Sequence, residues 1–260
     1  MQSSDPSKRC PKCGLLNAGT VVQCKCGYDL LAGDGRGAGR AGMLGFQPTE
    51  NLSTWVVTFL SVDMLLALVS LWSDWQHIDL LKRMQSGIGY TEQEFVENQS
   101  RQAVVGVIFF VNYLITSILF LRWVFLSNRN AHALGAENMK FTPGWSVGWF
   151  FVPIFHFWKP YAAMRELFKT SDPDYSGRWE EAPGPAWLPL WWLCWLASTG
   201  LGQASMRVSV GATETEELLT GAWLSLASDL VELPLAFLAI WIVKRLTELQ
   251  MDKLSRMPVV

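Results

Sequence analysis

Residues 144–160 read GWSVGWFFVPIFHFWKP, and the conformation of this stretch decides the topology of the chain. Its apolar part, residues 145–158, is only about 14 residues long, whereas a helix that crosses a bilayer needs about 20. Pro153 removes a backbone donor from the middle of the stretch, and Pro143 with Gly144 marks a turn before it. We therefore expect a short re-entrant or interfacial segment that returns to the membrane face from which it came.

The composition of the chain is typical of a membrane protein. Half of the 260 residues are hydrophobic, 17% are charged and 14 are tryptophan, which is more indole than a soluble domain normally carries. The lipid bilayer is the expected partner, and a net charge of −2 gives no indication of nucleic acid as a partner. Four stretches are long and apolar enough to span a bilayer, at about residues 54–73, 103–126, 187–206 and 222–243. The predicted fold is an all-α membrane protein with about four transmembrane helices and the short re-entrant or interfacial segment.

The distribution of basic residues predicts the orientation, because Lys and Arg accumulate in cytoplasmic loops. With four spans and the N-terminus inside, the outer loops carry Lys82, Arg83, Arg101 and Arg207. The long inner loop carries Arg129, Lys140, Lys159, Arg165, Lys169 and Arg178, and the tail carries Lys244, Arg245, Lys253 and Arg256. We therefore expect both termini on the cytoplasmic side.

The outer loop, residues 74–102, carries a helical pattern of its own. Apolar residues recur at helical spacing up to Gly87, and Thr91 with Glu94 has the spacing of a capping box. The second span is therefore expected to begin as a helix outside the bilayer. The acidic residues of this loop are interpreted as a solvated face.

Residues 159–171, KPYAAMRELFKTS, predict an amphipathic helix directly after the re-entrant segment. Its apolar face carries Tyr161, Met164, Leu167 and Phe168. Such a helix either lies at the lipid headgroups or packs on the cytoplasmic ends of the bundle.

The N-terminal head, residues 1–32, carries two cysteine pairs, which are Cys10 with Cys13 and Cys24 with Cys26. Tetrahedral zinc requires four soft ligands brought together by two tight turns, and CPKCG is a turn of this kind. The second half, CKCG, is one residue shorter than the usual CxxC. We expect a zinc-ribbon-like head with structural zinc on these four cysteines, and the alternatives are a redox dithiol pair or no metal. A flexible Gly-rich linker at 33–50, the membrane domain at 51–245 and a cytoplasmic tail at 246–260 complete the predicted organisation.

Polar residues inside the predicted spans are the remaining site candidates. Asp63 and Asn112 lie about halfway along the first and second spans. Asp229 and Glu232 are about one helical turn apart in the fourth span. Charged groups at this depth indicate an ion path, a proton relay or a structural pair. His156 could reach these acids if the re-entrant segment dips far enough, although a histidine among aromatic residues is more often a packing residue.

A family resemblance rests on residues 128–173, NRNAHALGAENMKFTPGWSVGWFFVPIFHFWKPYAAMRELFKTSDP. This run resembles the signature of an uncharacterised bacterial multi-pass membrane domain of unknown function, which often follows a short zinc-ribbon head. The similarity extends over most of residues 50–245, and the CKCG half of the head departs from the pattern. The resemblance implies a bacterial inner-membrane protein, and it implies no reaction.

Three classes of function remain open. The sequence most favours a membrane-tethered interaction or sensing protein whose zinc head binds a cytoplasmic protein partner. The alternative is a proton or cation pathway through the intramembrane acids. A membrane-embedded enzyme is the third class, but no nucleophile, base and orienting group occur at a recognisable spacing, so we expect no catalytic activity.

Overall fold

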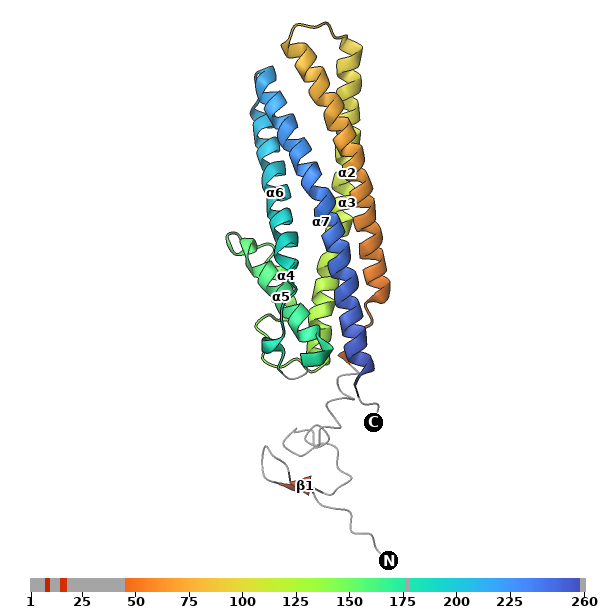
Figure 1. The fold of residues 1–260 in the computed structure, drawn as a ribbon, viewed down its shortest axis with the longest axis vertical. Coiled ribbons are helices and arrows are strands. Elements are labelled where there is room, and N and C mark those ends of the chain that lie inside the picture. The colour runs from red at the N-terminus through yellow and green to blue at the C-terminus, as the bar shows by residue number, and fades with distance from the viewer. Residues whose placement is uncertain (1–7, 10–14, 18–44, 176–177, 258–260) are drawn as a thin grey trace, which may run out of the picture.

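The computed structural model describes residues 8–9, 15–17, 45–175 and 178–257, most of which form four long helices (Figure 1). These helices are α2 (Glu50–Gln85), α3 (Glu92–Ala133), α6 (Leu188–Gly211) and α7 (Thr215–Ser255). Shorter helices lie between α3 and α6, and they are α4 (Pro143–Gly148), η2 (Phe155–Phe157), α5 (Lys159–Ser171), η3 (Pro173–Tyr175) and η4 (Trp179–Glu181). The predicted all-α class is confirmed for the membrane domain.

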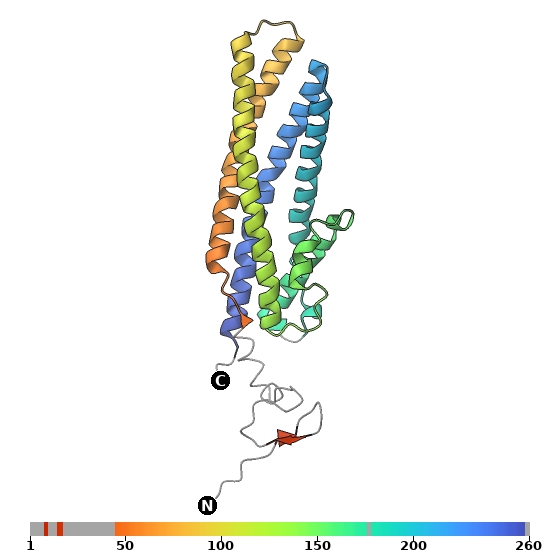
Figure 2. The ribbon, with the colours of Figure 1, turned by 180° about the vertical axis from the view of Figure 1, so that it is seen from behind.

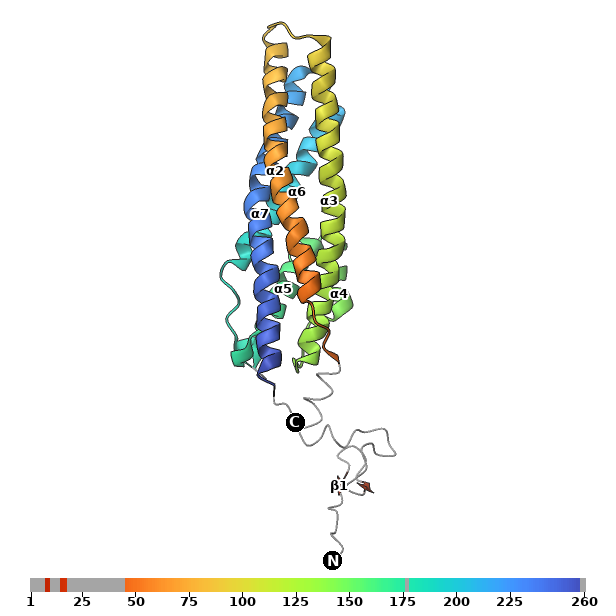
Figure 3. The same cartoon turned by 90° about the vertical axis from the view of Figure 1, so that its right-hand side faces the viewer.

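The four long helices run side by side with their turns at one end of the bundle. The turns at residues 86–91 and 212–214 define the hairpin end, whereas residue 45 and Met257 lie at the opposite end, which we call the terminal end (Figure 3). Helix α6 packs along α7, α7 along α2, and α2 along α3. Helices α4 and α5 pack on α3 in the terminal half (Figure 2). The main hydrophobic cluster also lies there, and its fully buried members include Trp123, Met164, Leu167, Leu188 and Ile242.

Helices α2 and α3 continue past the predicted spans toward the hairpin end. The predicted capping box starts α3, because Glu94 N donates to Thr91 Oγ1 (3.1 Å) and Thr91 N donates to Glu94 Oε2 (2.9 Å). Gly87 has a φ of 69°, a left-handed conformation that favours glycine, just after α2 ends. The expected helix outside the second span is therefore confirmed. One interpretation was wrong: Asp74 is 4% exposed and does not belong to a solvated face.

Helix α7 continues to Ser255, ten residues beyond the predicted end of the membrane domain at 245. Leu246 is fully buried. The buried Gln250 donates from Nε2 to the Ser127 carbonyl (2.8 Å) and to Ser171 Oγ (3.1 Å). Tertiary packing therefore orders residues that the charge pattern assigned to a tail.

Residues 143–158 do not form a continuous helix. Thr142 caps the six-residue α4, and the chain later turns at Ile154, whose φ is 67°. The Trp192 indole donates to the Phe157 carbonyl (2.7 Å), which satisfies a backbone acceptor outside regular helix. The chain then returns through α5 toward the terminal end (Figure 1). The segment thus has the shape expected of a re-entrant or interfacial element.

Helix α5 packs on the bundle through the apolar face that its sequence predicts. Met164 and Leu167 are fully buried and Phe168 is 4% exposed. Phe168 meets the Trp187 ring edge-on at 5.4 Å between ring centroids. Of the two expected positions for this amphipathic helix, the structure has the one packed on the end of the bundle.

The outer surface of the bundle is apolar over much of its length. Among the described residues, α2, α3 and α7 are long and apolar enough to cross a membrane. Large exposed apolar side chains cover the outside and include Leu65, Val107, Ile118, Leu193 and Phe237. Water would not stabilise so large an apolar surface, so it indicates contact with lipid. Helix α6 has 24 residues and is not among these three helices.

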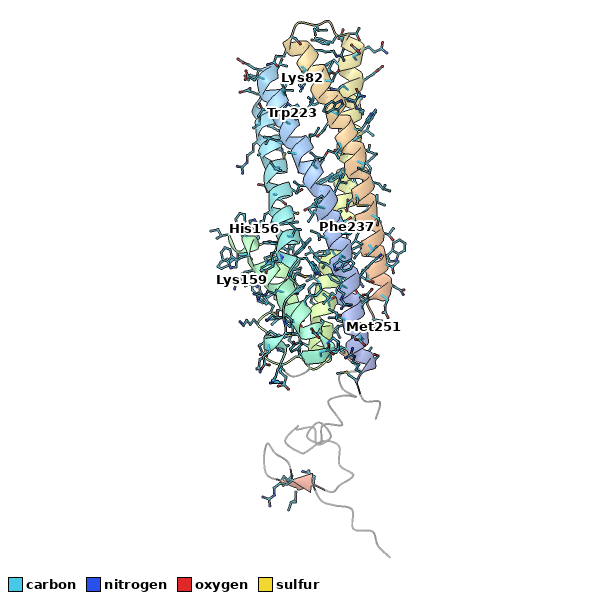
Figure 4. All side chains as sticks on the ribbon, viewed as in Figure 1. Lys82, His156, Lys159, Trp223, Phe237 and Met251 are labelled. Atoms are coloured by element: carbon cyan, nitrogen blue, oxygen red, sulfur yellow. The ribbon has the colours of Figure 1, made fainter. Side chains whose placement is uncertain are left out.

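Cations stacked on aromatic rings lie at two levels of this surface (Figure 4). Toward the hairpin end, Lys82 Nζ lies 5.0 Å from the ring centroid of Trp223. Toward the terminal end, Lys159 Nζ lies 5.4 Å from the ring of Trp149. Tryptophan and lysine are enriched where a membrane protein meets the headgroups, so these pairs indicate the two edges of the apolar band.

Two short strands, β1 (Lys8–Arg9) and β2 (Leu16–Asn17), pair in antiparallel register near the N-terminus. The four cysteines of the predicted zinc site lie outside the described residues, so the zinc-ribbon-like head stays a prediction. Within the described ranges, no group of three His, Cys, Asp or Glu residues is placed to hold a metal ion.

Candidate functional site

Asp63 lies in the middle of α2 and is buried against α3. Its two carboxylate oxygens accept hydrogen bonds from Asn112 Nδ2 (2.5 Å) and Thr116 Oγ1 (2.7 Å). Asn112 also donates to the Phe59 carbonyl (3.2 Å). Asn112 and Thr116 are four residues apart and therefore share one face of α3. The structure thus places the predicted site residues Asp63 and Asn112 in contact. It also shows a third partner, Thr116, which the four-residue spacing from Asn112 could have identified.

Glu232 of α7 faces α6 and accepts a hydrogen bond from Ser198 of that helix. Ser198 Oγ donates to Glu232 Oε2 (2.9 Å), and Ser228 Oγ donates to the Ser198 carbonyl (3.0 Å). Hydrogen bonds of this kind between helices fix the relative rotation of α6 and α7 in an apolar surrounding. The sequence identified Glu232 but not its partner Ser198, because Ser198 is distant in sequence.

Asp63 and Glu232 line one cavity of about 210 Å³ in the middle of the bundle. We call it the acidic cavity, although most of its wall is apolar. Phe150 and Phe151 of the segment between α4 and η2 contribute to it. The long helices contribute further apolar side chains, namely Leu60, Phe120, Leu121, Trp191, Trp195, Leu235, Ala236 and Ala239. Two carboxyl groups from α2 and α7 therefore share an aromatic enclosure.

The acidic cavity reaches the lipid-facing surface. Tyr113 and Phe151 line it, and they are 47% and 71% exposed. Both belong to the apolar exterior of the bundle. The wall of the cavity is therefore continuous with the apolar exterior of the bundle.

Two further acids, Asp229 and Asp74, lie between the acidic cavity and the hairpin end. Asp229 lies beside Ser70 of α2, and its charge interacts with those of Asp74 and Glu232. One oxygen of Asp229 and one of Asp74 are buried and accept no hydrogen bond from the described residues. The positions 63, 70 and 74 share one face of α2, a spacing that could have identified Asp74 from the sequence.

Polar side chains connect Asp74 to the end of the bundle. Gln102 Nε2 donates to Asp74 Oδ1 (3.3 Å), and Arg101 Nε donates to Ser73 Oγ (3.1 Å). Further along α2 and α3, the His77 ring hydrogen-bonds the side chain of Asn98, which is itself a partner of Arg101. A line of polar groups therefore runs from the acidic cavity to the hairpin end. Apart from Ser73, these residues lie in the stretch 74–102 that was predicted as the outer loop, whose acidic residues were interpreted as a solvated face.

His156 lies apart from the acids. Its ring contacts Phe157 (4.1 Å between ring centroids) and Trp195 (6.3 Å). Among the described side chains, no hydrogen bond joins His156 to Asp63, Asp229 or Glu232, so its surroundings are those of a packing residue. The structure therefore brings together four of the predicted intramembrane residues and leaves His156 outside the group.

Comparison with known proteins identifies a family but no activity. No curated protein and no solved structure matches the chain. A family model described as a domain of unknown function, DUF4328, matches residues 89–248. The matched part contains Asn112, His156, Asp229 and Glu232, whereas Asp63 precedes it. Because the match covers more than half of the 260 residues, this chain belongs to the DUF4328 family.

Proposed function

We propose that this protein is a membrane-tethered sensing protein whose membrane domain binds a small, lipid-soluble organic cation in the acidic cavity. The observation that supports the proposal is that Asp63 and Glu232, from two different helices, line one cavity whose wall is otherwise mostly apolar. The proposed role is binding and not catalysis.

Electrostatics favours a positively charged ligand at this place. Burying an acidic side chain in an apolar enclosure costs free energy unless the acid is protonated, hydrogen-bonded or paired with a cation. Asp63 has two donors and Glu232 has one, and the Asp63 charge acts on Glu232. A single cation between the two acids would relieve this repulsion.

The wall of the cavity suits the apolar body of such a ligand. Phe150, Trp191 and Trp195 offer aromatic faces, which attract an ammonium group as well as hydrocarbon. Access from the lipid past Tyr113 and Phe151 suits a ligand that partitions into the bilayer. The proposed ligand class is therefore an amphipathic amine or quaternary ammonium ion.

The test compares benzyltrimethylammonium with its uncharged isostere neopentylbenzene on the purified full-length protein in detergent. We expect only the cation to raise the thermal unfolding midpoint in a concentration-dependent manner. Glu232→Gln is expected to weaken this binding about tenfold or more, because one of the two charges is lost. Glu216→Gln is the matched control, since it makes the same change on an exposed part of α7.

Two outcomes would contradict the proposal. Equal stabilisation by the cation and its neutral isostere would show that the acids do not select charge. An equal loss of binding in Glu232→Gln and Glu216→Gln would show that the cation is not in the acidic cavity.

The proposal includes a topology. We propose four spans, in which α6 joins α2, α3 and α7 as the third span along the chain, because α6 packs along α7 up to the hairpin end. The basic residues near the terminal end support its placement on the cytoplasmic side of a bacterial inner membrane. The zinc-binding head would then lie in the cytoplasm, where it could contact a protein partner when the cavity is occupied.

A proton or cation pathway is the second candidate. The line of polar groups from the acidic cavity through Asp229 and Asp74 to Arg101 supports it. Flux measured in vesicles with reconstituted protein is expected to be lost in Asp229→Asn and kept in Glu216→Gln. If the parent protein conducts no protons or cations, the pathway is ruled out and the polar groups only join the helices.

A further inference from the structure

We propose that a second cavity, at the terminal end beside α5, binds a phosphate group, either that of an anionic phospholipid headgroup or free phosphate. This cavity, which we call the basic pocket, has a volume of about 270 Å³ and is lined by Lys140, Arg165 and Lys169. It is separate from the acidic cavity and has the opposite charge preference. The proposal does not depend on the proposed sensing function.

The basic pocket is built on fixed side chains. Phe141 and Trp179 line it and are 8% and 7% exposed. The Trp179 indole donates to the Glu137 carbonyl (2.7 Å), and Lys169 Nζ donates to the Glu180 carbonyl (2.9 Å). The pocket therefore has a defined shape without a ligand.

Two acids line the pocket: the carboxylate of Glu166 is already used by the backbone, and the side chain of Glu180 is exposed. Glu166 is buried, and its carboxylate accepts hydrogen bonds from Lys140 N and Phe141 N, both 3.0 Å long. Burial raises the pKa of Glu166, and these two N–H groups oppose that shift. Glu166 thus fixes the turn that carries Lys140 at the pocket.

The cations of the pocket remain available to a ligand. Within the described part of the chain, Lys140, Arg165 and Lys169 form no ion pair with a carboxylate. Lys140 and Arg165 are also exposed, so an incoming anion can reach them. A planar guanidinium beside two ammonium groups is a favourable arrangement for phosphate oxygens.

The position of the pocket favours a lipid as the source of the phosphate. Lys159 Nζ lies 5.8 Å from the ring of Phe141, which lines the pocket, and 5.4 Å from the ring of Trp149. The nearby Trp145 and Trp158 are 52% and 45% exposed. Exposed tryptophans beside lysines mark the headgroup level, so a phospholipid can place its phosphate in the pocket while its chains stay in the bilayer.

Native mass spectrometry of the full-length protein in detergent tests the proposal with short-chain phosphatidylglycerol, short-chain phosphatidylcholine and inorganic phosphate as probes. We expect one phosphatidylglycerol to be retained with an affinity that drops about tenfold in a Lys140→Gln, Arg165→Gln double variant. Lys244→Gln with Arg245→Gln is the matched control, because it also removes one lysine and one arginine from exposed sites near the terminal end. Thermal unfolding of both variants checks that they stay folded.

The probes separate the two sources of phosphate. If phosphatidylglycerol stays bound in the presence of millimolar inorganic phosphate, the ligand is the lipid headgroup. If inorganic phosphate binds tightly and displaces the lipid, the ligand is free phosphate. Equal retention of phosphatidylglycerol and phosphatidylcholine by the parent would overturn the proposal. So would an equal loss of phosphatidylglycerol in a folded control variant.

Discussion

Asp63 shows how one acidic residue is accommodated in an apolar helix pair. Asn112 and Thr116 hold both of its oxygens, so its burial does not leave them without hydrogen bonds. The same residue lines the acidic cavity, where its charge acts on Glu232. Its hydrogen bonds therefore stabilise the contact of α2 with α3 and also fix the carboxylate at the proposed ligand site.

Thr116→Val tests the structural part of this role. The change keeps the shape of the side chain and removes the donor to Asp63 Oδ2, so we expect the free energy of unfolding in detergent to fall by about 1 kcal/mol. Thr58→Val is the control, because the exposed Thr58 hydroxyl donates only to the Thr54 carbonyl of its own helix (2.9 Å). Equal stabilities of the two variants would show that the Thr116 hydrogen bond contributes nothing.

At the scale of the elements, the conformation of the segment from α4 to η2 depends on contacts with α6. It has only short helical turns, and Trp192 of α6 supplies the donor for the Phe157 carbonyl. Phe150 packs edge-on against the same Trp192 ring at 6.3 Å between ring centroids. Because Phe150 also lines the acidic cavity, α6 positions part of the cavity wall through this segment.

Trp192→Phe tests this dependence. The ring is largely kept and the indole donor is lost, so we expect the amides of Phe157 and Trp158 to exchange with deuterium about fivefold faster. Trp241→Phe makes the same change at an exposed position of α7 and is expected to leave that exchange unaltered. Unchanged exchange in both variants would mean that the segment keeps its conformation without the hydrogen bond.

The four cysteines of the N-terminal head lie outside the described residues, so only the sequence addresses its metal site. Two closely spaced cysteine pairs predict about one zinc ion per chain, measured by elemental analysis of the purified full-length protein. The metal is expected to be lost in a Cys10→Ser, Cys13→Ser double variant. Cys194→Ser is the control, because this free cysteine is half-buried in α6. An unmutated protein without metal would contradict the zinc-ribbon prediction.

At the scale of the whole molecule, the arrangement of the helices fixes which loops lie on the same side. Residues 86–91 and 212–214 both lie at the hairpin end, and the segment from α4 to α5 lies in the terminal half (Figure 1). If α6 crosses the membrane with the other three helices, its two ends must be reached from opposite sides. The side of the membrane from which each end of α6 is reached therefore tests the proposed number of spans.

Single cysteines in a cysteine-free background test that topology with a membrane-impermeant thiol reagent. Cysteines at Ser86 and Thr213 are expected to react in intact cells, whereas those at Glu137 and Ser255 react only after permeabilisation. All four positions are exposed, so a difference in labelling reports their side of the membrane. Labelling of Thr213 and Glu137 from the same side would contradict a spanning α6.

The sequence by itself determined which stretches of the membrane domain form long helices. It also identified the polar residues that lie within these apolar stretches. Length and hydropathy identified the long helices, Pro153 identified the interrupted segment, and the Thr91 capping box identified the start of α3, because each is a property of neighbouring residues. The same local reasoning placed Asp63, Asn112, Asp229 and Glu232 inside the spans. It could not show that they would meet, since depth along a helix does not fix its rotation.

Tertiary structure decided which of these residues meet and where the bundle ends. Ser198 became a partner of Glu232 only through the packing of α6 on α7. Asp74, which a local pattern assigns to a solvated face, is buried because α2, α3 and α7 continue together toward the hairpin end. The acidic cavity combines side chains from all four long helices, and the basic pocket combines α5 with residues before and after it. Such contacts depend on the rotation and packing of whole helices, which no stretch of sequence fixes alone.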